Sequence, residues 1–122
     1  MTKMVIRWKG KPEKHDYAAA AAYLSLTMDK PTAKAVAKKL KRAAILQYPA
    51  KDIFRASRLA LLSASNYHVE KDQQRIMAQE RLSPLLLYRD ERNGILIIAD
   101  GYHRLCAVYK FDEDAIIPCK IV

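Results

Sequence analysis

The sequence predicts an α+β fold, a small mixed sheet with packed helices that is preceded by an N-terminal helical hairpin. Residues 85–89 and 95–99 are short apolar runs, and the Asn93-Gly94 pair between them is a strong hairpin signal. After the second run, Leu105, Val108 and Tyr109 recur at helical spacing. The first 49 residues instead carry two helical patterns rich in alanine and lysine.

The N-terminal part is predicted to contain a short strand and then two helices. Residues 4–8 are a short apolar run typical of a strand. Asp16 is a suitable N-cap for a helix over residues 17–28, where alanine favours the helix. Pro31 lies near the start of a second helix over residues 32–47, a position that proline favours.

The rest of the chain is predicted to alternate between short strands and helices. Tyr48-Pro49 ends the helical hairpin, and Pro84 precedes the first strand of the β-hairpin. We expect these further elements: a strand over 51–54, a helical turn over 59–62, a loop over 63–68, a helix over 70–80, and a closing strand over 116–122.

Length and composition favour one domain over residues 1–122, with a basic helical extension over 1–49 and the core over 50–122. The net charge is +9, and residues 1–61 hold 14 Lys and Arg against 4 Asp and Glu. A polyanionic partner would therefore meet the N-terminal half. Without a long apolar run or a signal-peptide pattern, we expect a cytoplasmic protein that does not enter a membrane.

The two cysteines, Cys106 and Cys119, have no partner at metal-ligand spacing, so we expect core packing for both and no metal site. The most informative segment is the strand-to-helix corner at Asp100-Gly101. The first turn of a helix has backbone N–H groups without partners inside the helix, and its dipole makes that end electropositive. The corner is therefore a candidate phosphate or anion site.

Each residue of the corner has a candidate role. Gly101 permits close approach, and the backbone N–H groups of Tyr102 and His103 donate to a phosphate. Arg104 pairs with phosphate oxygens, and His103 donates or transfers a proton. Asp100 caps the helix, orients His103 or holds magnesium through water. The candidate catalytic residues are His103 and Asp100. An ordinary turn with a solvated arginine is the alternative.

The motif Asp100-Gly101-Tyr102-His103-Arg104, the helix that contains Ala107, and the segment Ile117-Pro118-Cys119-Lys120-Ile121 resemble the core of the ParB/sulfiredoxin superfamily. The resemblance extends back to the segment from Lys51 to Leu59. It implies a nucleotide, ATP or CTP with magnesium, held by its phosphates at the corner. It also implies that Arg55, Ser57 and Arg58 face the same nucleotide.

The chain departs from each activity of that superfamily. Sulfiredoxin-type reductases carry a cysteine where this chain has Tyr102, which excludes sulfinic-acid reduction. Partition-type ParB proteins have a Gly-Glu-Arg-Arg-like start and a helix-turn-helix domain, and this sequence is expected to be a stand-alone member without that domain. Free-serine kinases have a similar Asp-Gly-His-His-Arg-like corner but need an acidic base, for which only Asp52 or Glu70 is available.

Two functions follow from these observations. The first is a nucleotide-binding protein, a phosphotransferase or a nucleoside triphosphatase, with turnover left open. The alternative is an accessory module that binds nucleic acid weakly through a basic helix face. That face consists of Lys34, Lys38, Lys41 and Arg42. The sequence leaves the oligomeric state open, a homodimer included.

Overall fold

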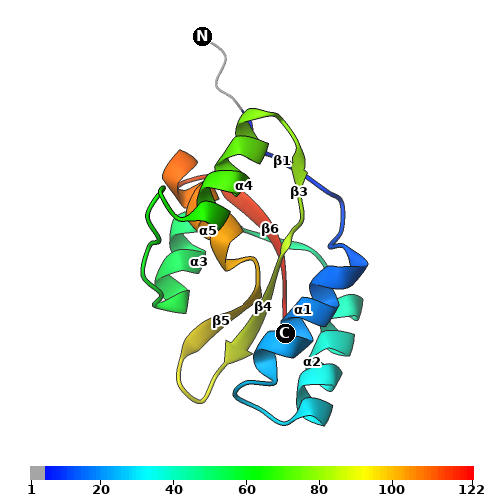
Figure 1. Ribbon diagram of the computed structural model, residues 1–122. Helices are drawn as coiled ribbons and strands as arrows, with labels where there is room; N and C mark the ends of the chain where they lie inside the picture. The colour runs from blue at the N-terminus through cyan, green and yellow to red at the C-terminus, as the bar shows by residue number, and fades with distance from the viewer. Residues whose placement is uncertain (1–4) are drawn as a thin grey trace.

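The computed structural model describes residues 5–122, and Figure 1 shows how their helices and strands are arranged. In chain order the elements are β1 (Arg7–Trp8), α1 (Lys14–Leu24), α2 (Lys30–Arg42), β2 (Leu46–Pro49), α3 (Ala50–Ser57), α4 (Tyr67–Met77), β3 (Arg81–Leu82), β4 (Leu85–Asp90), β5 (Ile95–Asp100), α5 (Tyr102–Phe111) and β6 (Ile116–Ile121).

The main sheet has four strands in the order β2-β6-β4-β5. It is mixed, because β6 runs parallel to β4 and antiparallel to β2, while β4 and β5 form an antiparallel hairpin. The strands β1 and β3 form a separate two-stranded parallel pair. The sequence predictions of an α+β class and a mixed sheet are confirmed.

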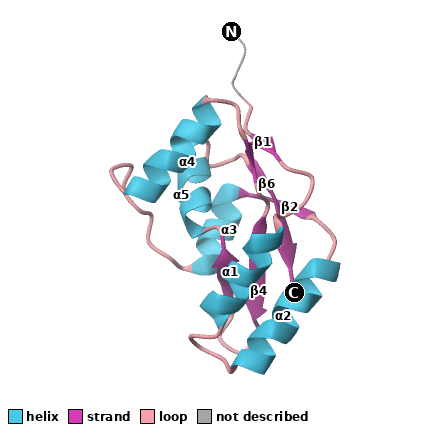
Figure 2. Ribbon diagram, turned by 45° about the vertical axis from the view of Figure 1, so that its right-hand side comes forward, coloured by secondary structure: helices cyan, strands magenta, loops and turns pink. Residues whose placement is uncertain are grey.

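Helices cover both faces of the main sheet, as Figures 1 and 2 show. Side chains alternate between the faces of a strand, so Leu85 and Leu87 join a core with α3, α4 and α5. Leu86 and Ala99 point the other way and pack against the α1–α2 hairpin. The molecule therefore has two apolar cores, one on each side of the sheet.

The C-terminal elements match their predictions closely. The β4–β5 hairpin turns at Gly94, which has a φ of 64° and follows Asn93, whose side chain donates to Asp90 at 2.8 Å. The strand over 95–99, the corner helix and the closing strand are confirmed as β5, α5 and β6. Cys106 and Cys119 are buried and unpaired, and burial raises the pKa of Cys119 to about 11.

The segment around Pro49 was predicted wrongly. The second helix ends at Arg42 rather than at 47, and residues Leu46–Pro49 form β2 because they pair with β6. The expected strand over 51–54 is part of α3, which buries Ala50 and Ile53 at helical spacing. The main sheet therefore includes β2 from the predicted extension over 1–49, together with β4, β5 and β6 from the predicted core over 50–122.

Other boundaries also differ from the predictions. Helix α1 begins at Lys14, so Asp16 lies in its first turn and accepts from the backbone N–H of Glu13 at 2.7 Å, instead of being the N-cap. Helix α4 begins at Tyr67, inside the predicted loop over 63–68, with Asn66 as its N-cap. Residues 59–62 form no helical turn, because Arg58 has a φ of 57° and ends α3.

The N-terminal strand is shorter than predicted. Of the strand expected over residues 4–8, Met4 lies outside the described residues, and the strand observed is Arg7–Trp8. None of the helices in residues 5–122 is both long and apolar enough to cross a membrane.

Candidate functional site

The predicted corner lies where β5 ends at Asp100 and α5 begins at Tyr102. Gly101 joins them as the N-cap of α5 with a φ of 112°, a conformation that favours glycine. The first bond inside the helix runs from the N–H of Leu105 to the carbonyl oxygen of Gly101 at 2.9 Å. The N–H groups of Tyr102 and His103 therefore precede the first intrahelical bond.

The atoms around Gly101 also leave no room for a side chain at this position. A Cβ atom at this position would lie 2.8 Å from Cγ of Leu85 and 2.9 Å from Nη2 of Arg104. Both distances are shorter than side chains tolerate, and Leu85 is fully buried. The missing side chain therefore lets the guanidinium of Arg104 fold back over the turn.

Arg104 is held in a fixed position at the start of α5. Its Nη2 donates to Oδ2 of Asp100 at 3.1 Å and to the carbonyl oxygen of Pro84 at 3.4 Å. Only 16% of the Arg104 side chain and 17% of the Asp100 side chain are exposed. Among the described residues, no atom accepts from the buried Nε of Arg104. A buried donor on a charged group is costly when it has no acceptor.

Helix α4 forms the other wall of the site, and the sequence analysis did not predict this contribution. The corner opens into a hollow of about 220 Å³ whose other wall is formed by His68, Lys71, Asp72 and Arg75. These four residues have the spacing of one helix face, so the pattern was available in the sequence. The sequence predicts a loop over residues 63–68, and that prediction separates His68 from the other three residues, whereas α4 begins at Tyr67.

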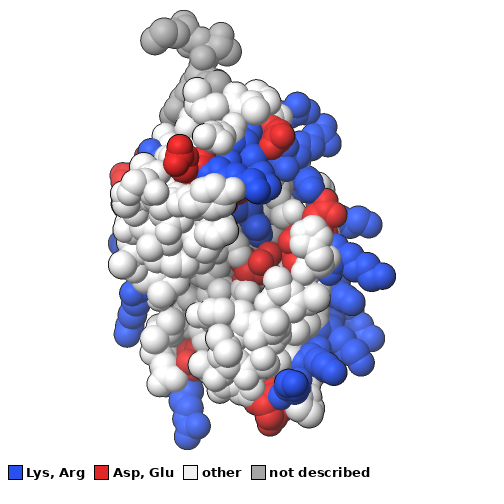
Figure 3. All heavy atoms as spheres, in the orientation of Figure 1, with Lys and Arg blue, Asp and Glu red and all other residues white. Residues whose placement is uncertain are grey.

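The hollow contains charges of both signs. Lys71 and Arg75 are exposed, whereas Asp72 is buried and accepts from Nη1 of Arg75 at 3.3 Å. Figure 3 shows basic and acidic side chains close together around a recess between α4 and α1. Together with Arg104 the hollow has three permanent cations against two carboxylates, before the dipole of α5 is added.

Burial perturbs the ionisable groups of the hollow. It raises the pKa of Asp72 against the opposing effect of Arg104 and Arg75, and it raises the pKa of Asp100 against the effect of Arg104. Burial lowers the pKa of His103, and the nearby His68 lowers it further. His103 is therefore neutral at pH 7 and can accept a proton.

A row of rings borders the hollow. The ring centroids of His68 and His103 lie 4.8 Å apart, and those of Tyr67 and His68 lie 5.3 Å apart. Tyr67 is 68% exposed. The Tyr102 hydroxyl donates to the carbonyl oxygen of Ala60, which ties the loop after α3 to the corner. The rim therefore offers flat surfaces beside a charged interior.

Three residues predicted to face the same ligand lie elsewhere. Arg55 and Arg58 line a separate hollow of about 710 Å³ with Tyr109 and Glu113. Ser57 is buried, and its hydroxyl donates to the carbonyl oxygen of Phe54 at 2.8 Å, as a residue at the end of a helix does. The structure thus brings together Asp100 to Arg104 but not this second group.

The basic face of α2 lies on the other side of the sheet from α4 and α5. Lys34, Lys38 and Lys41 line a groove between α1 and α2, whereas Arg42 is exposed outside it. Within residues 5–122 there is no cluster of His, Cys, Asp or Glu side chains suited to a metal ion. Comparison with protein-family models, with curated proteins and with solved structures gives no match.

Proposed function

We propose that the corner binds the phosphate groups of a nucleotide, as the ParB/sulfiredoxin-like motif predicts. The observation that carries this proposal is the arrangement of Arg104. Its guanidinium is held over the open first turn of α5, in a hollow that also presents Lys71 and Arg75. Backbone N–H donors and an oriented arginine are the usual partners of phosphate oxygens.

The size of the hollow determines which part of a nucleotide would lie inside it. At about 220 Å³ it is smaller than most pockets for whole ligands, so it suits phosphates rather than a complete nucleotide. The nucleoside would lie outside, where the exposed ring of Tyr67 provides a stacking surface. Specificity for the base would then be weaker than specificity for the phosphates.

The two carboxylates of the hollow both accept from arginine, Asp100 from Arg104 and Asp72 from Arg75. A magnesium ion supplies charge neutralisation to a bound triphosphate, and here it would be held by phosphate oxygens and water, with Asp72 or Asp100 as outer ligands. We assign Asp100 chiefly to positioning Arg104. His103, kept neutral by burial, is the group we assign to proton transfer.

Isothermal titration calorimetry with ATP and CTP in the presence of magnesium tests the proposal. We expect binding below millimolar concentration, and we expect Arg104→Ala to weaken it about ten- to a hundredfold. Arg58→Ala is the matched control, because Arg58 lines the other hollow and should leave the affinity unchanged. If neither nucleotide binds to the wild type, or if the two variants behave alike, the proposal is wrong.

Turnover is tested separately from binding. If the protein hydrolyses or transfers the terminal phosphate, His103→Ala should abolish that reaction while the nucleotide affinity changes little. Equal activity of His103→Ala and the wild type would show that His103 has no part in proton transfer.

A further inference from the structure

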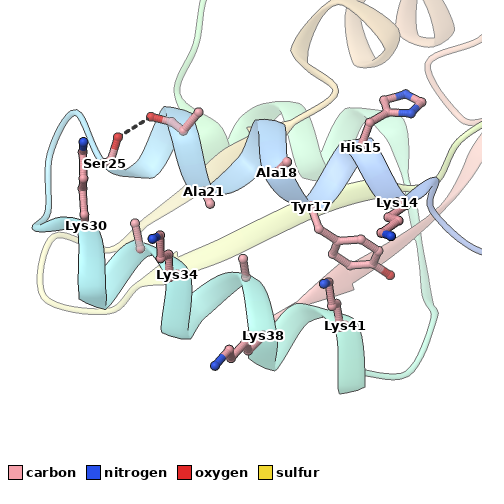
Figure 4. Close-up of a pocket in the computed structure, with 13 residues that line it drawn as sticks. Lys14, His15, Tyr17, Ala18, Ala21, Ser25, Lys30, Lys34, Lys38 and Lys41 are labelled. Atoms are coloured by element: carbon pink, nitrogen blue, oxygen red, sulfur yellow. Dashed lines mark hydrogen bonds between the residues drawn. The ribbon is translucent and has the colours of Figure 1, made fainter.

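The α1–α2 groove differs from the corner in position and in chemistry. Its floor consists of methyl groups from both helices, and Figure 4 shows lysines along its side on α2. The groove has a volume of about 930 Å³. Its floor is formed by Ala18, Ala21, Ala22, Ala33 and Ala37.

Helix α1 is unusually apolar for a helix at the surface. After its first turn, α1 has no charged side chain, yet Ala18 and Ala22 in the groove are exposed, as are Ala19 and Tyr23 outside it. A helix without a polar face is normally covered on all sides. In this molecule the sheet covers one side of α1 and α2 covers another, which leaves the face along the groove without a partner.

The rim has charge of one sign only. Lys30, Lys34, Lys38 and Lys41 follow one another at spacings of four, four and three residues along α2, and no Asp or Glu lines the groove. Within the described residues none of these four lysines forms a salt bridge. Like charges at this spacing repel one another, so the row is unfavourable until it meets negative charge.

From this juxtaposition we propose that the groove docks an acidic amphipathic helix of a partner protein. The lysine row spans about 16 Å at 1.5 Å per residue, which is three turns of a partner helix. Glutamates with the same spacing on that helix would meet the lysines, and its small or apolar residues would pack on the alanine floor. The proposal does not depend on nucleotide binding at the corner.

A nucleic acid fits the groove less well. Phosphates would meet the lysines, but among the described residues that line the groove the exposed ring is that of His15 in the first turn of α1, which cannot stack successive bases. Tyr17, the tyrosine of the groove, is 9% exposed, and the Nζ atoms of Lys41 and Lys120 lie 5.7 and 5.4 Å from the centroid of its ring. The methyl floor is complementary to apolar side chains and offers no hydrogen bonds to bases.

Fluorescence anisotropy with a synthetic peptide tests the proposal. The probe is an Ala- and Leu-rich helix of about 18 residues with glutamates at the spacing of the lysine row, and its control is a scrambled peptide of equal composition. We expect micromolar affinity for the designed helix and at least about tenfold weaker binding of the scrambled one. A labelled DNA duplex is titrated in parallel.

Neighbouring lysines provide a matched pair of variants. Lys38 lines the groove, whereas the adjacent Lys39 is exposed outside it. Lys38→Glu should weaken peptide binding about tenfold or more, and Lys39→Glu, with the same change in net charge, by less than about threefold. Circular dichroism confirms that both variants stay folded.

Ala18→Arg separates docking from general attraction between charges. The added side chain fills the floor, so docking weakens, while the added charge strengthens any binding that is only electrostatic. The proposal is overturned if the two peptides bind equally or not at all, or if Lys38→Glu and Lys39→Glu act alike. It is also overturned if Ala18→Arg strengthens peptide binding, or if the duplex binds more tightly than the designed helix.

Discussion

The corner hollow and the α1–α2 groove are both basic, but they hold their cations in different ways. In the hollow, Arg104 is mostly buried and fixed by Asp100 and by the Pro84 carbonyl. In the groove, the ammonium groups of Lys34 and Lys38 stand in solvent at the ends of flexible side chains. The first arrangement suits a small anion of defined shape, and the second suits a long surface.

This difference shows why net charge is a poor guide to the site. The N-terminal half carries the positive excess of the sequence, whereas the corner lies in the half that is close to neutral. A few buried and oriented groups recognise an anion better than many solvated ones, because solvent and salt screen the exposed charges. The following variants test the contrast between a fixed site and a mobile one.

The largest expected effect is on the turn that fixes the corner. Gly101→Val should lower the free energy of unfolding by about 3 kcal/mol, since it adds backbone strain and a clash with Leu85. Gly94→Val is the matched control, with a positive φ but nothing within 4 Å of an added Cβ, and should cost about 1 kcal/mol. Urea unfolding measures both, and equal losses would mean that packing at Gly101 is unimportant.

The groove has one fixed cation beneath it. Lys120 is buried, and its Nζ donates to the carbonyl oxygen of Lys41 in the last turn of α2 at 3.0 Å. Lys120→Met should therefore lower the free energy of unfolding by about 1.5 kcal/mol, whereas Lys38→Met should change it by less than about 0.5 kcal/mol. A stable Lys120→Met variant would contradict a structural role for this ammonium group.

A smaller effect is expected at Asp72. Because burial raises its pKa, the folded state holds a proton more tightly than the unfolded state, and this contribution to stability is lost as the pH rises through the raised pKa. Asp72→Asn should therefore be more stable than the wild type at pH 7, with the difference vanishing below about pH 4. Urea unfolding at both pH values checks this. A less stable variant at pH 7 would show that the ion pair with Arg75 outweighs burial.

The smallest expected effect is the uptake of a fraction of a proton when the nucleotide binds. The pKa of His103 is lowered by burial, and a phosphate anion beside it would raise that pKa again. Binding near pH 6 should therefore take up a fraction of a proton, measured as a dependence of the calorimetric heat on the ionisation enthalpy of the buffer. His103→Gln should remove this uptake, and His15→Gln, on α1 and outside the hollow, should not.

The features predicted correctly from the sequence depend on local signals. Asn93-Gly94 marks its turn without help from other residues, and Gly101 separates a strand from a helix within a few positions. The strand β2 depends on pairing with β6, which lies about 70 residues later, and no local pattern in Leu46–Pro49 reports that partner. The segment 51–54, predicted as a strand, is too short to show a period of its own, and it is helical as part of α3, which buries Ala50 and Ile53.

The candidate site likewise contains residues whose proximity the local sequence predicts and residues whose proximity depends on packing. Residues Asp100 to Arg104 are consecutive, so their proximity follows from the chain itself. His68 and Asp72 reach the corner only because α4 packs against α5, and such packing of distant helices has no signature in either segment. Arg55 and Arg58 were assigned to the site by resemblance, and the structure places them at a different hollow.

The position of β6 has a consequence for how the protein is made. This strand follows β2, β4 and β5 in the chain, yet it lies between β2 and β4 in the sheet. While the ribosome is still translating residues 116–121, the edges of β2 and β4 that later pair with β6 are open, and the core shared with α3, α4 and α5 lacks Ile117. The sheet is therefore completed only after this segment has emerged from the exit tunnel, and until then the unpaired edges are open to aggregation.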